Sequence, residues 1–535
     1  MLFNSYVFLF AFLPLSITGF FLTARFNRVA ARLWLIVVSF VFYGWWNPIF
    51  CLFLAASIAG NYGVSRLIGM TEQTPRRQTL ILCAGIATNL AVLGYFKYLM
   101  WLAGLVNAAL GTRFDTGFIA LPLGISFFTF TQIGYLVDCH AGVAGNRKPW
   151  NYILFVTFFP HLIAGPILHN QEIMPQFDEP ATYRWSSTNM MVGGGIFIAG
   201  LLKKTLLADP AGTGIANAFA HPETLPMFAA WESALSYSLQ LYFDFSGYSD
   251  MAIGLARMFN VTFPMNFDSP YKAASVIDYW QRWHMTLTRY LTRYLYTPIA
   301  VAAMRARRAR GLPINRAAQQ TLAGFCHMIA WPIVATMTLA GIWHGSGAQF
   351  LVFGVLHGIY LSVNHAWRLI HGGPNPSSPF RIAHVALTYL CVLVGAVFFR
   401  APSVAAAMSM LGGMVGLHGL GGGMPIPDGL LDAAKVPPLI ASLSSIGLVH
   451  FGAAWSEIGT SLGILVWFAV LFGIVWLLPN TQQIFARYAP TIEPARPGAL
   501  FQFRAAVRWA IVLGCGAALA VLSLGGASEF IYFQF

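Results

Sequence analysis

Long apolar runs separated by short polar or basic segments make up most of this sequence. A helix that crosses a bilayer needs about 20 predominantly apolar residues, so the pattern predicts an all-α polytopic membrane protein with about 11–14 membrane helices plus re-entrant or interfacial helices. The expected apolar helices lie near 5–22, 33–46, 50–67, 79–100, 118–137, 151–168, 190–207, 229–258, 320–343, 348–370, 382–399, 437–451, 460–478 and 506–525.

Two features of the first hundred residues bear on topology. The run interrupted at Asn47-Pro48 is interpreted as two passes, because two passes keep the basic clusters at 25–32 and 66–77 on one side of the membrane. The N-terminal apolar run has no preceding basic residues, and Arg25 stands where a signal-peptide cleavage site would be. It is therefore expected to be an uncleaved first span.

The segment 260–316 differs from the apolar runs. Its beginning, 260–267, is too interrupted for a span, whereas 271–299 is amphipathic and rich in aromatic and basic residues. Such helices are expected at the cytoplasmic membrane face. The Gly- and Pro-rich region 403–435 is expected to be a loop on the opposite side. The whole chain, 1–535, is predicted to form one membrane domain with a catalytic core at about 90–400 and the interfacial segment at about 260–316.

Composition excludes an ordinary soluble protein. Hydrophobic residues make up 57% of the chain and charged residues 9%, against about a quarter charged in soluble domains. The net charge of +13 comes from short clusters between apolar runs, as in cytoplasmic loops, so nucleic acid is not an expected partner. The six cysteines show no CxxC pair, which favours small buried side chains over a disulfide framework.

His344 is the first candidate for chemistry, because it lies within the apolar run 331–358. A titratable ring at membrane depth is costly and marks a functional site by default. The neighbouring Gly341 and Gly345 are expected to leave room for a close approach to the ring. His344 is interpreted as a general base, with a hydrogen bond between helices as the structural alternative.

The second candidate is the segment 278–291. If it forms one helix, Trp280, Trp283 and His284 share a face, as do Arg282 and Arg289 two turns apart. The segment is then either an interfacial helix with aromatic anchors or a docking surface for an anionic donor such as a coenzyme A phosphate.

Further polar residues interrupt the apolar runs. Asp244 and Ser246 either cap a helix break or line an acyl tunnel. Prolines and glycines in 121–130 and 159–166 predict broken helices that line a cavity. Neither a metal site nor a bound cofactor is predicted. Three other histidines lack a metal-type spacing, so packing or interfacial roles are expected for them: His161, His169 and His357.

Taken in order, several motifs resemble the membrane-bound O-acyltransferase (MBOAT) family, and most closely its bacterial branch typified by the alginate O-acetylation membrane protein. The resemblance extends from end to end of the chain and is carried by residues 3–10, 93–98, 121–127, 163–166, 242–250, 280–288, 341–345 and 530–535. One departure is 296–303, where the family often has a glycine-rich turn and this chain has none.

The resemblance implies a funnel-like helical fold with a catalytic histidine at His344 and a second important histidine at His284. It also implies an acyl donor that enters from the cytoplasm and an acceptor outside it. In alginate-type systems a separate periplasmic acetyltransferase completes the transfer to the polysaccharide.

We therefore expect an O-acyltransferase of the bacterial inner membrane that moves acetyl groups from a cytoplasmic thioester, acetyl-CoA, towards an exported alginate- or cellulose-type polysaccharide. His344 is the expected base or holds the acceptor hydroxyl, and His284 positions the donor or assists on the cytoplasmic side. The other expected donor-binding or tunnel-lining residues are Arg282, Arg289, Trp280, Trp343, Asp244 and Ser246. Transfer of D-alanine or another acyl group to an envelope polymer is the alternative within the enzyme class, and a small-solute or glycan transporter is the alternative outside it.

Overall fold

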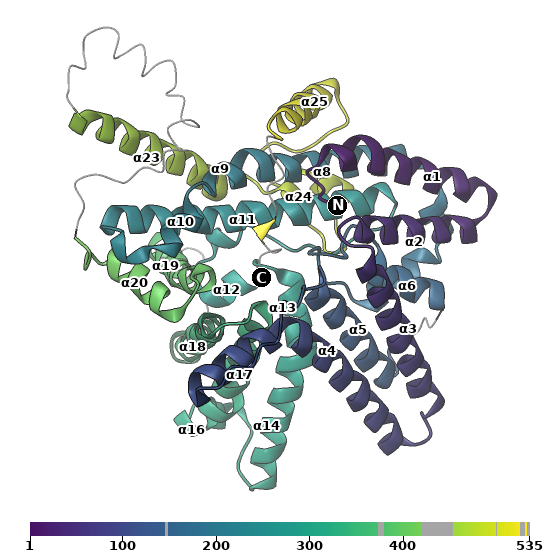
Figure 1. The fold of residues 1–535 in the computed structure, drawn as a ribbon, viewed down its shortest axis with the longest axis horizontal. Helices are drawn as coiled ribbons and strands as arrows, with labels where there is room; N and C mark the ends of the chain where they lie inside the picture. Colours follow the sequence, from purple (N-terminus) through teal and green to yellow (C-terminus); the bar gives the residue numbers. More distant parts are fainter. Residues whose placement is uncertain (145–147, 373–378, 420–452, 499, 525–529, 532–535) are drawn as a thin grey trace.

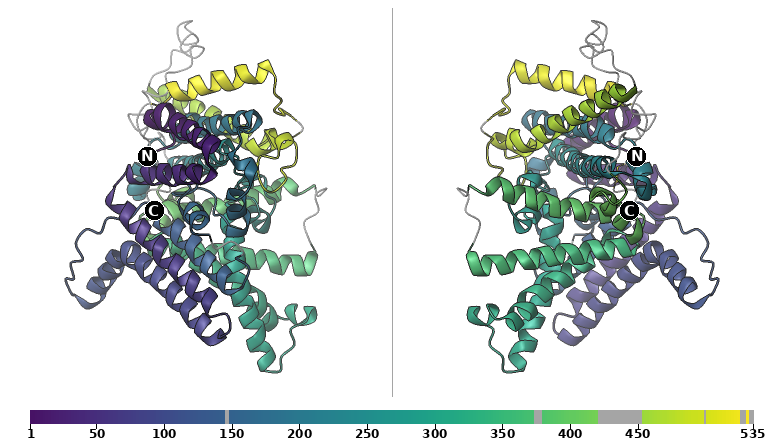
Figure 2. Two further views of the ribbon diagram at one scale, coloured as in Figure 1. Left: turned by 90° about the vertical axis from the view of Figure 1, so that its right-hand side faces the viewer. Right: turned by 90° about the vertical axis from the view of Figure 1, so that its left-hand side faces the viewer.

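The computed structural model describes residues 1–144, 148–372, 379–419, 453–498, 500–524 and 530–531. Helices dominate these residues, and no strand occurs among them. Figure 1 shows α8 and α11 crossing the middle of the molecule side by side, and Figures 1 and 2 show the long α3, α4 and α14 diverging from them. The expected all-α polytopic architecture is confirmed.

The elements run in the following order. The N-terminal half contains η1 (Phe8–Phe12), α1 (Leu13–Phe26), α2 (Arg28–Gly44), α3 (Ile49–Met70), α4 (Pro75–Leu110), α5 (Ile125–His140), α6 (Pro149–Thr157), α7 (Asn170–Ile173), η2 (Met174–Phe177), η3 (Pro180–Tyr183), α8 (Ser187–Leu202), η4 (Lys203–Ala208), α9 (Asp209–Ala211), α10 (Ile215–Ala220), η5 (Pro222–Thr224) and α11 (Met227–Met258). The remainder contains η6 (Pro270–Lys272), α12 (Val276–Trp280), α13 (Met285–Leu291), η7 (Thr292–Tyr296), α14 (Thr297–Ala309), α15 (Arg316–Gln319), α16 (Leu322–Phe325), η8 (Cys326–Ala330), α17 (Trp331–His344), α18 (Ala348–His371), α19 (Arg381–Arg400), α20 (Val404–Met414), α23 (Ala453–Leu477), α24 (Thr481–Ile484), η9 (Ala486–Tyr488) and α25 (Val507–Leu522).

Seven helical stretches of the described chain are long and apolar enough to cross a membrane. They are Phe8–Phe26, Ile49–Met70, Pro75–Leu110, Ser187–Ala211, Leu322–His344, Ala348–His371 and Arg381–Arg400. The division at Asn47-Pro48 into two helices is confirmed, because α2 ends at Gly44 and α3 begins at Ile49. The larger number of spans stays a prediction, and the helix expected at 437–451 lies outside the described residues.

The contact between α8 and α11 rests on two pairs of glycines. A Cβ atom on Gly200 would lie 2.5 Å from the carbonyl oxygen of Gly247, and one on Gly193 would lie 2.5 Å from that of Gly254. The pairs are seven residues apart on each helix, so the two backbones touch over two turns. Small residues at helix contacts allow such close approach inside membranes, where burial of apolar surface gives little driving force.

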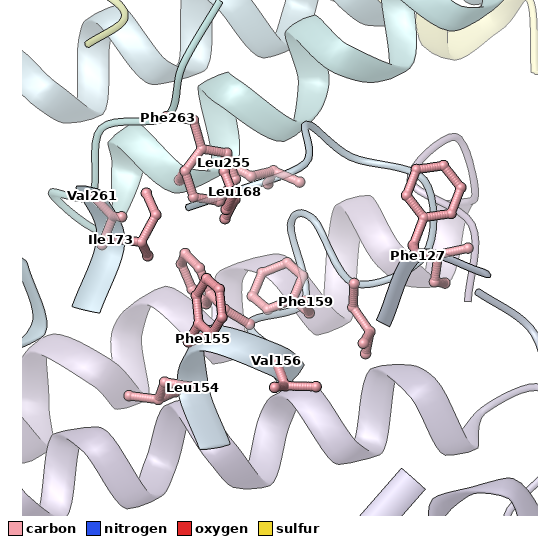
Figure 3. Packing of buried hydrophobic residues seen from close by; sticks show 14 of the residues in the cluster. Phe127, Leu154, Phe155, Val156, Phe159, Leu168, Ile173, Leu255, Val261 and Phe263 are labelled. Carbon is pink, nitrogen blue, oxygen red and sulfur yellow. The ribbon is translucent and has the colours of Figure 1, made fainter. Parts of the chain in front are cut away.

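The helix expected at 151–168 is wrong beyond its first half. The α6 helix ends at Thr157, and the chain continues without a regular helix to His169. Pro160 contributes to this break, because proline lacks a backbone donor and disfavours the helical conformation in the residue before it. The irregular stretch is nevertheless buried, and Figure 3 shows Leu168 packed near Leu255 and Phe263.

Three further boundaries differ from expectation. The helix expected from 118 begins only at Ile125, after Gly124 with a φ of 72°. The segment 278–291 is not one helix, because α12 ends at Trp280 and α13 begins at Met285. Part of the loop expected at 403–435 is helical, as α20, with Ser403 as its N-cap.

The glycine contact between α8 and α11 predicts a strong difference between two alanine substitutions. Gly200→Ala forces the backbones apart and should cost about 1–3 kcal/mol, as over-packing does elsewhere. Gly194→Ala is the matched control on the same helix, because no described atom lies within 4 Å of its Cβ position. Thermal unfolding of the detergent-solubilised variants should show a lower Tm for the first and an unchanged or raised Tm for the second. Equal Tm values would contradict the role given to this contact.

Candidate active site

His344 is the last residue of α17. Gly345, which follows it, has an extended backbone (φ −164°, ψ 163°), and the helix stops there. The Lys97 side chain of α4 donates from Nζ to the carbonyl oxygens of Trp343 (2.7 Å) and His344 (2.9 Å), and the Tyr98 hydroxyl donates to that of Ile342 (2.7 Å). These donors satisfy carbonyls that a helix end leaves without partners and match the negative end of the helix dipole. Two side chains of α4 therefore hold the C-terminal end of α17, which includes the backbone of His344.

The glycines around His344 do not leave the open space that the sequence suggested. A Cβ on Gly341 would lie 2.3 Å from the carbonyl oxygen of Phe350, so this glycine serves the close packing of α17 on α18. A Cβ on Gly345 would lie 2.2 Å from the Phe350 ring. Approach to the His344 ring therefore comes from another direction.

That direction is a narrow cavity lined by His344. Its volume of about 30 Å³ corresponds to roughly two ordered water molecules. The walls come from α11, from the segment between η6 and α13, and from α17, α18 and α19, and they are mostly aromatic: Leu241, Tyr271, Tyr279, Trp280, Trp283, Leu287, His344, Phe353, His357, Val392, Ala396 and Phe399. The Phe399 and Phe353 rings pack on the His344 ring with centroids at 5.1 and 6.0 Å.

His284 lies in the break between α12 and α13. Its backbone adopts the left-handed conformation (φ 43°, ψ 52°), which is uncommon and costly for a residue other than glycine. The side chain is fully buried, and Nδ1 lies 3.0 Å from Asn266 Oδ1. Burial lowers the pKa of His284 to about 3, so the ring is neutral at physiological pH. His284 and His344 are near enough for a charge on one ring to act on the other.

His357 also lines the cavity, although the sequence indicated only a packing or interfacial role. Trp280 Nε1–H donates to its Nδ1 at 3.3 Å, so the neutral ring carries its proton on Nε2. Gly395 of α19 makes room for that edge, because a Cβ there would lie 2.4 Å from His357 Nε2. The other two histidines contact Phe263 and Tyr294 instead: His161 and His169.

Neither predicted donor-binding arginine lies on the cavity wall. Arg282 donates from Nε to Asp278 at 2.7 Å and lies 3.9 Å from Asp268. Arg289 forms ion pairs with Glu172 and Glu493. Because the helix breaks at His284, the two arginines do not share the helix face that a continuous segment would have given them. A phosphate would have to displace or join the carboxylates that already bind each guanidinium group.

The other predicted tunnel residues occupy different positions. Trp280 lines the cavity, whereas Trp343 faces α5 and stacks on Phe130 with centroids at 4.7 Å. Asp244 is buried on α11, accepts from Lys204 Nζ at 2.6 Å and accepts from the Ile531 backbone at 3.0 Å. Ser246 is buried on the same helix and is not among the lining residues. Asp244 therefore anchors neighbouring segments of the chain.

Comparison with known proteins decides the family. The model of the membrane-bound O-acyltransferase family matches residues 118–312. A probable alginate O-acetylase of Azotobacter vinelandii is 33% identical over 551 residues, which covers 100% of both chains. This chain belongs to the membrane-bound O-acyltransferase family. The expected resemblance is thereby confirmed, and the protein is a multi-pass membrane O-acyltransferase.

Two further relatives show the range of polymers within the family. The peptidoglycan O-acetyltransferase of Helicobacter pylori is 37% identical over 451 residues, 78% of this chain and 81% of the relative. The teichoic acid D-alanyltransferase of Streptococcus thermophilus is 26% identical over 253 residues, 46% of this chain and 57% of the relative.

Two residues that contact the candidate histidines were not proposed as site residues from the sequence. Lys97 is a charge within a predicted apolar helix, the same signal that marked His344, so it could have been found on that ground. Asn266 is one polar residue in an interrupted segment, and nothing in the sequence shows that its side chain meets His284.

Lys97→Met should impair acyl transfer without preventing membrane insertion. The change leaves two buried carbonyl groups at the end of α17 without their donor, at about 1–3 kcal/mol each, and loosens His344. We expect transfer to fall by about tenfold or more, because small displacements of reacting groups are costly. Lys97→Arg should retain more activity, since its guanidinium group can still donate to both carbonyls.

Tyr98→Phe is the matched control, because it removes one donor from the same helix end but not from His344 itself. At an equal protein level in the membrane, Tyr98→Phe should reduce the amount of transferred acyl groups less than Lys97→Met does. Wild-type transfer by Lys97→Met would show that the lysine does not position His344.

Proposed function

We propose that this O-acyltransferase transfers acetyl groups from a cytoplasmic thioester, acetyl-CoA, to hydroxyl groups of an exported polysaccharide. The observation that carries the proposal is that His344 lines a narrow aromatic cavity beside the buried His284. The small volume favours a short acyl group, because a long acyl chain would require the aromatic walls to move. The names of the alginate and peptidoglycan relatives, both O-acetylating enzymes, agree with this choice.

The chemistry is the attack of an acceptor hydroxyl on the thioester carbonyl carbon. His344 takes the hydroxyl proton, the new C–O bond forms, and the C–S bond breaks with release of the thiol, which recovers the proton. A general base must be neutral and within hydrogen-bond reach of the proton, and effects of about 10²–10⁴ in rate are typical. His357 lines the same cavity, and its Nε2 edge lies against Gly395 of α19.

The acceptor is proposed to be an alginate- or cellulose-type polymer outside the cytoplasm, reached directly or through a periplasmic acetyltransferase partner. We accordingly propose a location in the bacterial inner membrane, with the thioester entering from the cytoplasm. Arg282 and Arg289 are proposed to hold donor phosphates, exchanging a carboxylate partner when the donor binds. D-Alanyl transfer is less well supported, because the relative with that name matches under half of this chain.

His344→Ala should abolish acetyl transfer in proteoliposomes supplied with acetyl-CoA and a polysaccharide acceptor. Release of free CoA and acetyl content of the acceptor should both fall by about 10²-fold or more, the usual loss when a general base is removed. His384→Ala is the matched control, because His384 is an exposed histidine at the start of α19.

The alternatives give different results in the same vesicles. A transporter would move the solute without consuming a thioester, and a D-alanyltransferase would require another acyl donor. Undiminished CoA release and acetylation by His344→Ala would overturn the role of His344.

A further inference from the structure

The hydrogen bonds around His284 determine which of its two ring nitrogens carries the proton. Asn266 Oδ1 lies 3.0 Å from His284 Nδ1, and the Thr286 hydroxyl donates to the same oxygen at 2.8 Å. The three side chains are completely buried. On the other side of the amide, Asn266 Nδ2 donates to Ser249 Oγ at 2.9 Å.

The orientation of the Asn266 amide follows from groups that can only donate. The Thr286 backbone N–H points at the Asn266 side-chain atom facing His284, at 3.4 Å, so this atom must be the oxygen. The Thr286 hydroxyl accepts from the Ile167 backbone N–H at 3.0 Å, which leaves its own proton for Asn266. An amide oxygen accepts only, so the ring nitrogen that meets it must be the donor.

We propose that Asn266 is a positioning residue that fixes the neutral His284 ring with its proton on Nδ1 and its lone pair on Nε2. His284 then acts as a proton or hydrogen-bond acceptor towards the reacting groups, rather than only holding the donor. The role of His284 as an acceptor in the reaction rests on the proposed function. The tautomer of His284 does not depend on the proposed function. A neighbour that fixes the tautomer of a functional histidine is a recurrent device.

The backbone around His284 supports this role. Met285 N donates to Asn266 O at 2.9 Å, and Asp268 N donates to Arg282 O at 2.9 Å, so the segment 266–268 is joined to the break between α12 and α13. These contacts hold His284 in its left-handed conformation. The ring meets Asn266 at its Nδ1 edge, and Phe245 packs edge-on against it with ring centroids 4.7 Å apart. The titratable group that the structure brings near the ring is His344, which in turn lies near Lys97 and His357.

The direct test is nitrogen NMR of the full-length protein in proteoliposomes, with ¹⁵N-labelled histidine. The His284 signals are assigned by their loss in His284→Ala. We expect a protonated Nδ1 and an unprotonated Nε2 in the wild-type protein. A protonated Nε2 would overturn the proposal, whether or not the protein transfers acetyl groups.

Substitutions then distinguish a positioning role of Asn266 from a role in folding alone. Asn266→Leu should allow the Nε2–H form and lower kcat by about 10–100-fold with little change in KM, the usual effect of losing such a neighbour. Ser249→Ala is the matched control, because it removes a hydrogen bond from the same amide but on its donor side, and both tautomer and kcat should persist.

Thr286→Val and Thr286→Ser keep the test decisive if Asn266→Leu does not fold. Valine should weaken the Nδ1–H preference and lower kcat, and serine should restore both. An unchanged tautomer in Asn266→Leu and in Thr286→Val would refute the role of Asn266. Loss of the Nδ1–H tautomer with unchanged kcat would show that His284 is not used as an acceptor. The role of His344 is tested separately by His344→Ala.

Discussion

Hydrogen bonds of Asn266 connect the segment 266–268 to the break between α12 and α13, and the geometry of the site depends on these hydrogen bonds. Inside a membrane protein, each backbone or side-chain polar group that loses water needs a partner within the fold. The break between α12 and α13 leaves such groups around His284 without helical partners, and the Asn266 side chain and backbone carbonyl bind four of them: His284 Nδ1, the Thr286 hydroxyl, Thr286 N and Met285 N. A continuous helix would need no such residue, but it would place His284 differently.

The second fixed point is the end of α17. Lys97 binds the carbonyl oxygens of Trp343 and His344, while the glycine contacts of Gly341 set the distance between α17 and α18. His344 is therefore held by its backbone, and aromatic rings of Phe353 and Phe399 hold its side chain. Apart from the small cavity that it lines, the His344 side chain is buried, which limits the access of bulk water to the ring.

The sequence predicted much of the fold, because long apolar runs carry their own signal. The separation of α2 from α3 at Asn47-Pro48 and the functional candidate His344 could both be read from composition along the chain. The break at His284 could not, because the residues 278–291 contain neither proline nor glycine and suit a helix. Tertiary hydrogen bonds to Asn266 outweigh that local preference. The pairing of Arg289 with Glu172 and Glu493 joins residues far apart in sequence, so spacing gave no indication of it.

The most direct measurement of the central claim is a cryo-EM structure of the full-length protein with a non-transferable acetyl-CoA analogue, such as a ketone in place of the thioester. We expect the acetyl end to occupy the cavity between Trp280 and Phe399, with its carbonyl carbon about 3–3.5 Å from the acceptor position beside His344. An analogue whose acetyl end lies outside this cavity, away from both His344 and His284, would contradict it.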